Sequence, residues 1–342
     1  MKIIVNSAAA STRQSYGAIE HYRNLGPYDH LRRYMDVPIS FEPKNRITEI
    51  DWGNFDAFHF QNPCTDNDIK MAMRAKHEGL KVVADYDDDL INLPVNNHNF
   101  LRFPSAQERQ QFIAKFCDLA DAVTVSTQRL HDNLKEWCEP VIIPNSWYKQ
   151  KQPKATQPPN AVCLWRGSQS HADDIIEFQN EVVDLMQDSK NLRWIFWTDT
   201  ANIAAWTMDI PSVHEDTENG KWQKFPAAPM VEYMHKMAGS VRPMVTIVPL
   251  KNYPFNHAKS NIAWIEATLA GGVAVVPDWH EWQNKGTLRY KNRKEFKEQV
   301  MKVLMGKVNV EKMNAESMKE IEIKYNLDIN NQKRKEIWEQ WV

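Results

Sequence analysis

The chain has 342 residues, of which 42% are hydrophobic and 25% are charged, and its formal net charge is -2. This length suffices for two domains with a core each, and the composition excludes a disordered or fibrous chain. The near-neutral charge gives no overall attraction to nucleic acid, so any such contact must come from a local patch.

The sequence shows no sign of a membrane span, a signal peptide or a disulfide framework. No apolar run reaches the roughly 20 residues that a span needs, and the first one, 1–5, ends at Asn6. We therefore expect a cytoplasmic protein without stable membrane insertion. The cysteines lack CxxC spacing, so neither a zinc site nor a disulfide is indicated and we expect reduced thiols; they are Cys64, Cys117, Cys138 and Cys163.

The first half alternates short β-rich runs with helical patterns, which is typical of a parallel sheet with crossover helices. Strands are predicted at 2–5, 57–60, 81–84, 122–125 and 141–143, and helices at 19–35, 66–78, 106–119 and 127–137. Gly26 and Pro27 should interrupt the first helix, because proline lacks a backbone donor and disfavours a helical residue before it.

A segment without hydrophobic periodicity, 146–160, is rich in Lys, Gln and Pro and is predicted to be a linker, with a domain boundary near residue 150. A second alternating series follows, with strands at 161–165, 192–197, 244–248 and 273–276, and helices at 173–186, 230–237, 261–269 and 294–304. We therefore expect an α/β chain of two Rossmann-like domains, 1–150 and 151–325, that face each other across a cleft. The last segment, 326–342, is helical and charged, and a return to the first domain would bury its tryptophans.

The most informative stretch joins the predicted strand 244–248 to the predicted helix 261–269 and contains Lys259, Ser260 and Asn261. A cation, a hydroxyl and free backbone N–H groups at the first turn of a helix suit a diphosphate. Glu266 lies further along the helix, where its carboxylate can accept hydrogen bonds from ribose hydroxyls. The alternative is a surface helix with an incidental lysine and glutamate.

An acidic run, 85–89, follows the predicted strand 81–84, and α/β proteins bind ligands at the carboxyl ends of their strands. Three interpretations stay open. Asp85, Asp87 and Asp88 can contact a sugar or accept a proton from an acceptor hydroxyl. The run can instead hold a divalent cation, or it can be a solvated turn that caps a helix. Crowded carboxylates raise one another's pKa, which is compatible with a base.

The stretch that contains Lys259 and Glu266 resembles the donor-binding segment of group 1 GT-B glycosyltransferases, in particular their bacterial and bacteriophage branch. The matching positions are Phe255-Asn256, Lys259-Ser260-Asn261, Glu266-Ala267 and Gly271 followed by 273–276. In the wider family a second glutamate stands eight positions before the ribose-binding one, and here that position is Ala258. This departure bears on how the transferred sugar is held, whereas Lys259 and Glu266 match.

Three other segments are similar to the same family, and one of them, 120–127 with 143–145, resembles its last N-domain unit and exit. Gly17, with Tyr22-Arg23 and Pro27, resembles the first loop and helix, and Trp165-Arg166-Gly167-Ser168 with His171 resembles the start of the C-terminal domain. There, the resemblance implies that Gly167 leaves room for phosphate and that Arg166 pairs with it bidentately. Taken alone, Gly17 and Gly167 are also compatible with ordinary turns.

The resemblance implies a GT-B fold and transfer of a sugar, with retention of configuration, from a nucleotide-sugar donor, most often a UDP-sugar, to an acceptor hydroxyl. Lys259 and Arg166 would stabilise charge on the departing diphosphate, and Glu266 would orient the ribose. Asp87 or Asp88 would act near the sugar and the acceptor. No metal is required in this scheme, and closure of the domains would exclude water.

The acceptor stays open between a glycan and, because of the phage-like branch, a 5-hydroxymethylated pyrimidine in DNA, modified in the host cytoplasm. DNA would require a basic groove and base flipping. Basic clusters occur at 70–76, 149–154 and 285–297, but each is also explained as solvated surface. Two further alternatives are a non-catalytic nucleotide-binding module, which Ala258 favours, and a GT-B epimerase or phosphorylase.

Overall fold

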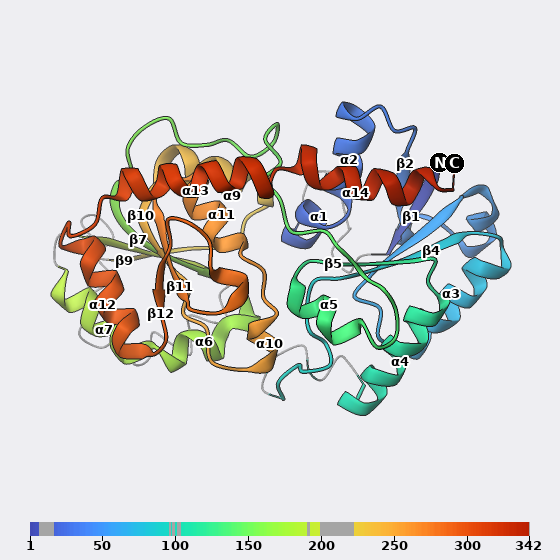
Figure 1. The fold of residues 1–342 in the computed structure, drawn as a ribbon, viewed down its shortest axis with the longest axis horizontal. Coiled ribbons are helices and arrows are strands. Elements are labelled where there is room, and N and C mark those ends of the chain that lie inside the picture. Colours follow the sequence, from blue (N-terminus) through green and yellow to red (C-terminus); the bar gives the residue numbers. More distant parts are fainter. Residues whose placement is uncertain are drawn as a thin grey trace.

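The computed structural model describes residues 1–6, 17–95, 97, 100, 104–189, 192–198 and 222–341. They form two six-stranded parallel sheets that lie side by side, each flanked by helices (Figure 1). The predicted α/β class with two parallel sheets is confirmed. Long C-terminal helices run along one side of the molecule and span both halves (Figure 1).

The N-terminal sheet has the strand order β2-β1-β3-β4-β5-β6. Its strands are β1 (Lys2–Asn6), β2 (Ser40–Pro43), β3 (Ala57–Gln61), β4 (Lys81–Tyr86), β5 (Ala122–Val125) and β6 (Val141–Ile142). The inner strands read as continuous apolar runs because crossover helices cover both faces of a parallel sheet. Those helices are α1 (Ala18–Tyr22), α2 (Leu25–Tyr34), α3 (Asp66–His77), α4 (Ala106–Leu119) and α5 (Gln128–Leu134).

The C-terminal sheet has the order β12-β11-β10-β7-β8-β9. Its strands are β7 (Asn160–Gly167), β8 (Arg193–Thr198), β9 (Trp222–Phe225), β10 (Pro243–Ile247), β11 (Val273–Pro277) and β12 (Leu288–Tyr290). Helices α6 (Ala172–Glu177), α7 (Gln179–Asp188), α9 (Met230–Lys236), α10 (Pro254–His257), α11 (Ile262–Leu269) and α12 (Arg293–Leu304) pack around it, and a π-helical turn (Met237–Val241) extends α9.

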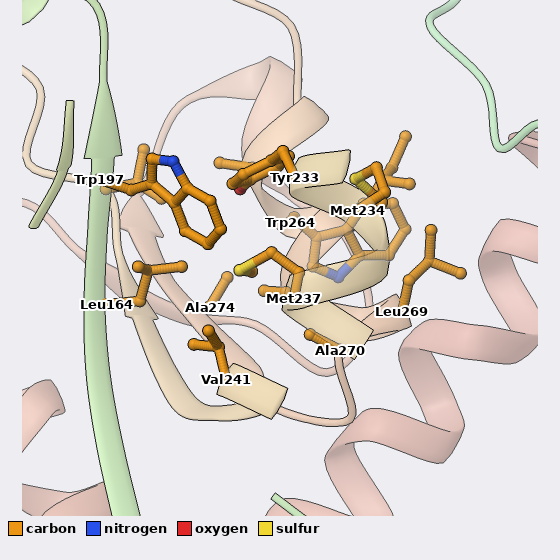
Figure 2. Close-up of a cluster of buried hydrophobic side chains, with 14 of the residues drawn as sticks. Leu164, Trp197, Tyr233, Met234, Met237, Val241, Trp264, Leu269, Ala270 and Ala274 are labelled. Carbon is orange, nitrogen blue, oxygen red and sulfur yellow. The ribbon is translucent and has the colours of Figure 1, made fainter. Parts of the chain in front are cut away.

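The core beneath α9 and α11 fixes α11, the helix that follows the loop 248–261. Figure 2 shows Trp197, Tyr233, Met237 and Trp264 gathered in this cluster, and all four side chains are buried. The indole Nε1 of Trp264 donates a hydrogen bond to Ser317, so even its polar edge is satisfied. Because an aromatic core of this kind allows little rotation, α11 is held in one orientation.

Three edge strands, β2, β9 and β12, were not predicted. They are three or four residues long, and β2 ends in Pro43, which cannot donate to a sheet ladder. Short edge strands of this kind pair on one side only and need no apolar run. The hydrophobic periodicity of the sequence therefore does not reveal them.

The first helical segment breaks at a different place from the one predicted. The break lies at Arg23 and Asn24, and Pro27 sits in the first turn of α2, where a missing N–H is tolerated. Gly26 permits a close approach of the two helices, since an added Cβ would lie 2.2 Å from the carbonyl oxygen of His21. The glycine is therefore needed for packing rather than for breaking the helix.

The two C-terminal helices, α13 (Val310–Lys324) and α14 (Leu327–Glu339), lie on different halves: α13 packs on α11 and α14 packs on α2. Trp338 of α14 is buried against Tyr28 in the core of the N-terminal sheet, with ring centroids 5.7 Å apart. The predicted linker is also packed, because Trp147 and Tyr148 are buried within it and Trp147 hydrogen-bonds to the α13–α14 junction.

Candidate active site

A cavity of about 220 Å³ lies where the carboxyl ends of β4, β7 and β10 meet between the two sheets. From the N-terminal half it is lined by Ala18, Ile19, Asp87 and Asp88, and its lining from the C-terminal half includes Trp165, Arg166, Ser168, His171, Leu250, Lys259, Ser260 and Trp282. The topology explains this placement, because parallel strands direct their following loops to one sheet edge. Acidic and basic predicted site residues therefore meet in one cavity.

Asp87 and Asp88 form the acidic wall of this cavity. One oxygen of Asp87 accepts hydrogen bonds from the amide groups of Gln61 and Asn62, at 3.1 and 2.7 Å. Asn62 adopts a left-handed backbone conformation with φ of 50° and also accepts from the backbone N–H of Asp87. Burial raises the pKa of Asp87 to about 7, with Asp88 and Asp85 adding to the rise. At neutral pH this carboxyl is poised to take up or release a proton.

Asp85 lies outside the residues that line the cavity and is 1% exposed. Arg23 pairs with both of its oxygens, at 2.5 and 2.9 Å, and Thr124 donates a further hydrogen bond. Burial by itself raises the pKa of this carboxyl, but the guanidinium of Arg23 outweighs it and the pKa lies at about 2. The first aspartate of the run is thus a permanently ionised partner of a buried arginine.

Lys259 extends across the cavity from the C-terminal half. Its Nζ lies 2.7 Å from an oxygen of Asp88 and 4.5 Å from the centre of the Phe255 ring. Both charged groups keep some contact with solvent, so an incoming anion can reach the lysine. In this arrangement the carboxylate of Asp88 neutralises the ammonium of Lys259.

Arg166 is the second-last residue of β7 and points toward Glu266 of α11, with Nε 2.8 Å from Oε2. This contact is an ion pair more than a well-directed hydrogen bond, because Nε lacks a partner of good hydrogen-bond geometry among the described residues. The hydroxyls of Tyr22 and Tyr233 each donate to one oxygen of Glu266, at 3.0 and 2.9 Å. Burial raises the pKa of Glu266, against the effect of Arg166 and the tyrosines.

Glu266 is 2% exposed and is not among the residues that line the cavity. Tyr22 belongs to α1 of the N-terminal half, yet it packs in the core cluster of the C-terminal sheet. Its hydroxyl also accepts a hydrogen bond from Gln152. This tyrosine therefore links the two halves behind the cavity.

The other predicted donor residues lie at the same edge. Ser260 lines the cavity and accepts a hydrogen bond from Asn145 at 2.8 Å, whereas Asn261 is buried and donates to Asn284. Gly17 precedes α1, whose first residues line the cavity. Gly167 ends β7, where an added Cβ would lie 2.8 Å from the Trp165 ring.

Ala258, which stands where the wider family has a glutamate, packs into the core of the N-terminal sheet and is 1% exposed. Its carbonyl oxygen accepts a hydrogen bond from Thr127 of the opposite half. The methyl group therefore serves the contact between the two halves.

Sequence reasoning missed the network around Asp174. One oxygen of Asp174 accepts from Asn256 and from the backbone N–H of Lys251, and the other lies 2.8 Å from Nδ1 of His171. It therefore holds the loop 251–256 and orients the imidazole that lines the cavity. The signal was a carboxylate three residues after His171 in the first turn of a helix, which is too common to single out.

Among the described residues, no group of three or more His, Cys, Asp or Glu side chains is arranged to hold a metal ion. Within the same residues, no helix is long and apolar enough to cross a bilayer.

The sequence matches no protein-family model and no curated protein. Solved structures do resemble it. Anabaena HepE in complex with UDP and glucose has a TM-score of 0.67 at 11% identity, over 99% of this chain and 100% of that one. A UDP-forming α,α-trehalose-phosphate synthase from Burkholderia vietnamiensis gives 0.62 at 9% identity, over 97% and 95% of the two chains.

A mutant of S. aureus TarM, in complex with Fondaparinux, alpha-GlcNAc-glycerol and UDP, gives a TM-score of 0.59 at 10% identity. There the match covers 86% of this chain and 57% of that chain, so this chain spans little more than half of TarM. At such identities the similarity establishes the fold alone. That fold, two Rossmann-like units across a cleft, is the GT-B fold of glycosyltransferases.

Proposed function

We propose that this chain is a glycosyltransferase that moves a sugar from a UDP-sugar to an acceptor hydroxyl. The observation that carries the proposal is the meeting of Arg166 and Lys259 with Asp87 and Asp88 in one cavity between two Rossmann-like units. Cations on one wall suit a diphosphate, and a carboxyl with a pKa of about 7 on the other suits an acceptor hydroxyl. UDP in complexes of similar folds supports the choice of donor.

In the proposed reaction the bond between the anomeric carbon and the β-phosphate oxygen breaks, and its electron pair stays on UDP. Arg166 and Lys259 stabilise the charge that grows on the departing phosphate. The acceptor oxygen bonds to the anomeric carbon, and its proton passes to the carboxylate of Asp87. Asp88 releases Lys259 to the diphosphate and turns to the sugar. We propose retention of configuration on the family resemblance, which requires the acceptor oxygen to approach the anomeric carbon on the same face from which the phosphate leaves.

Further roles follow for the remaining donor residues. Glu266 is proposed to bind the ribose once Tyr22 has moved, while Ser260 and the backbone at Asn261 contact the phosphates. Gly17 and Gly167 keep the two cavity edges free of side chains. Asp85 acts through Arg23, by holding the strand end that carries Asp87. We propose that the N-terminal half receives the acceptor and the C-terminal half the nucleotide, without a requirement for metal.

For the acceptor, a glycan is favoured over a 5-hydroxymethylated pyrimidine in DNA. Most cations of the three basic clusters are already paired with carboxylates, which leaves little of a basic groove. The pairs include Lys70 with Asp66, Arg74 with Glu49, Lys76 with Asp121, Lys151 with Asp29, Lys154 with Glu322 and Lys297 with Asp184.

The test is release of UDP from a pool of UDP-sugars, alone, with oligosaccharides, and with duplex DNA that contains 5-hydroxymethylcytosine. Products are identified by mass, and proton NMR of the new anomeric position reports the stereochemistry. We expect slow release with donor alone and faster release with a saccharide. DNA-dependent release with a sugar mass on the base would move the acceptor to DNA. Isomerised donor without release would indicate an epimerase, and binding without consumption of any donor would indicate a non-catalytic module.

A further inference from the structure

A second cavity, of about 370 Å³, lies beside the first at the carboxyl ends of β5 and β6. Its walls come from both halves and from the junction of α13 and α14. We propose that this cavity binds a neutral carbohydrate on the acceptor side of the reaction, an inference that rests on the proposed function.

The polar part of the lining consists mostly of neutral side chains. Ser126 is 3% exposed, and its hydroxyl has no hydrogen-bond partner within the described parts of the chain. Buried hydroxyls are rarely left unpaired, so Ser126 is a candidate partner for a ligand group that enters the cavity. Thr127, Gln128, Ser260, Asn261 and Asn330 add further hydroxyls and amides to the same cavity. Side chains of this kind both donate and accept, as the hydroxyls of a sugar do.

The apolar part of the lining suits the C–H faces of a sugar ring. Tyr325 is fixed in place, because its ring packs edge-on against Trp264 at 5.4 Å and its hydroxyl accepts from Asn284. Ile323 and Ile329 lie at the same cavity and are 69% and 49% exposed. Exposed aliphatic side chains beside a fixed aromatic ring form a surface that a partly apolar ligand can cover.

The charges around the cavity do not favour an anion. Lys324 is paired with Glu320, and Lys333 donates to the carbonyl oxygen of Ile142. Glu281 contributes a negative charge to the lining and accepts from the backbone N–H of Arg129. A polyanion such as DNA gains most of its affinity from several free cations, and this lining does not offer them.

The cavity is placed to serve the transfer reaction, because Ser260 lines both cavities. A saccharide bound here lies next to the donor site and can present a hydroxyl to it. The walls come from both halves, so a ligand bound here touches both halves where they meet.

The experiment is saturation-transfer NMR on the full chain with UDP as internal reference. The probes are glucose, galactose, N-acetylglucosamine, maltose, cellobiose, chitobiose and, separately, duplex DNA that contains 5-hydroxymethylcytosine. Ser126→Leu fills the cavity and Ile323→Glu changes its exposed rim, while Ser240→Leu and Ile50→Glu are matched changes at exposed positions outside it. We expect the ratio of saccharide to UDP signal to fall about tenfold in Ser126→Leu, the effect of losing one well-placed hydrogen bond. A smaller fall is expected in Ile323→Glu, and none in the controls.

The saccharide signals test the carbohydrate site, and the UDP signal tests the proposed function. Absence of signal from every saccharide, or signal that survives both cavity variants, overturns the carbohydrate site while UDP binding keeps the proposed function alive. Signal from duplex DNA with 5-hydroxymethylcytosine alone, lost in Ser126→Leu, would replace carbohydrate by nucleic acid. If UDP itself gives no signal, the proposed function fails regardless of the saccharides.

Discussion

The two walls of the central cavity carry opposite charges and are held in different ways. On the acidic wall, Asp87 is fixed by neutral amides, and the buried pair of Arg23 and Asp85 anchors the strand end beneath it. On the basic wall, Lys259 pairs with Asp88 across the cavity, where both groups meet solvent. Asp87 is therefore held by the fold of the N-terminal half, whereas Lys259 is held by a solvent-accessible ion pair that an anion can replace.

Removal of the Arg23 guanidinium should destabilise the fold beneath Asp87. Arg23 and Asp85 are 0% and 1% exposed, so Arg23→Met leaves a buried carboxylate without its counter-charge. We expect a loss of about 3–5 kcal/mol in the free energy of unfolding, measured by denaturant titration. Arg33→Met is the control, because Arg33 is 58% exposed in its pair with Asp29 and should cost about 1 kcal/mol or less. Equal losses in the two variants would contradict the distinction, and adding Asp85→Asn to Arg23→Met should recover part of the loss.

Removal of the Lys259 ammonium should weaken the binding of UDP and change the free energy of unfolding little. The proposed charged contact to the diphosphate is worth about 1.5–3 kcal/mol, so Lys259→Ala should raise the Kd for UDP roughly tenfold to a hundredfold. Calorimetric titration measures it. Lys291→Ala is the control, because Lys291 is 72% exposed and lies outside the cavity.

Asp88→Asn provides the complementary test of this wall. It removes the carboxylate that occupies Lys259, so UDP should bind as tightly as before or more tightly. Weaker UDP binding in Asp88→Asn would show that Asp88 is not a substitute for the ligand.

The raised pKa of Asp87 predicts a pH dependence of stability. The folded-state pKa is about 7 and the unfolded value is near 3.9. Between these values the unfolded chain has released the proton that the folded chain keeps, so stability falls as pH rises from 4 to 7. Asp87→Asn mimics the protonated form and should match the wild type at pH 4 but exceed it at pH 8, by on the order of 1 kcal/mol. Denaturant titrations at both pH values measure this difference. An equal difference between Asp87→Asn and the wild type at pH 4 and pH 8 would show that the pKa of Asp87 is not raised.

The framework of both walls could be predicted from the sequence. The inner strands are buried apolar runs, and the carboxyl end of a parallel strand is a fixed place, so Asp87, Arg166 and Lys259 were expected at one cleft and they line one cavity. The short edge strands were missed because periodicity carries no signal over three or four residues.

Partner choice within the site could not be predicted in the same way. Asp85 and Asp87 are two residues apart on the chain, yet their pKa values shift in opposite directions, because Arg23 reaches Asp85 whereas burial dominates at Asp87. Arg23 and Asn62 reach them from other elements, and nothing local specifies that pairing. The role of Tyr22 depends on α1 of one half packing into the core of the other, a contact that only the assembled fold reveals.

The smallest expected effect concerns the link between the halves. Tyr22 donates to Oε1 of Glu266, whereas Oε2 accepts from Tyr233 and also lies 2.8 Å from Arg166. Tyr22→Phe should therefore cost about 1 kcal/mol of unfolding free energy, and Tyr233→Phe should cost less, because Arg166 still serves its oxygen. If Glu266 binds the ribose, the freed Oε1 in Tyr22→Phe should also strengthen UDP binding by up to about threefold. Tyr233→Phe should show no such gain. Weaker UDP binding in Tyr22→Phe alone would mean that Glu266 serves the contact between the halves and not the nucleotide.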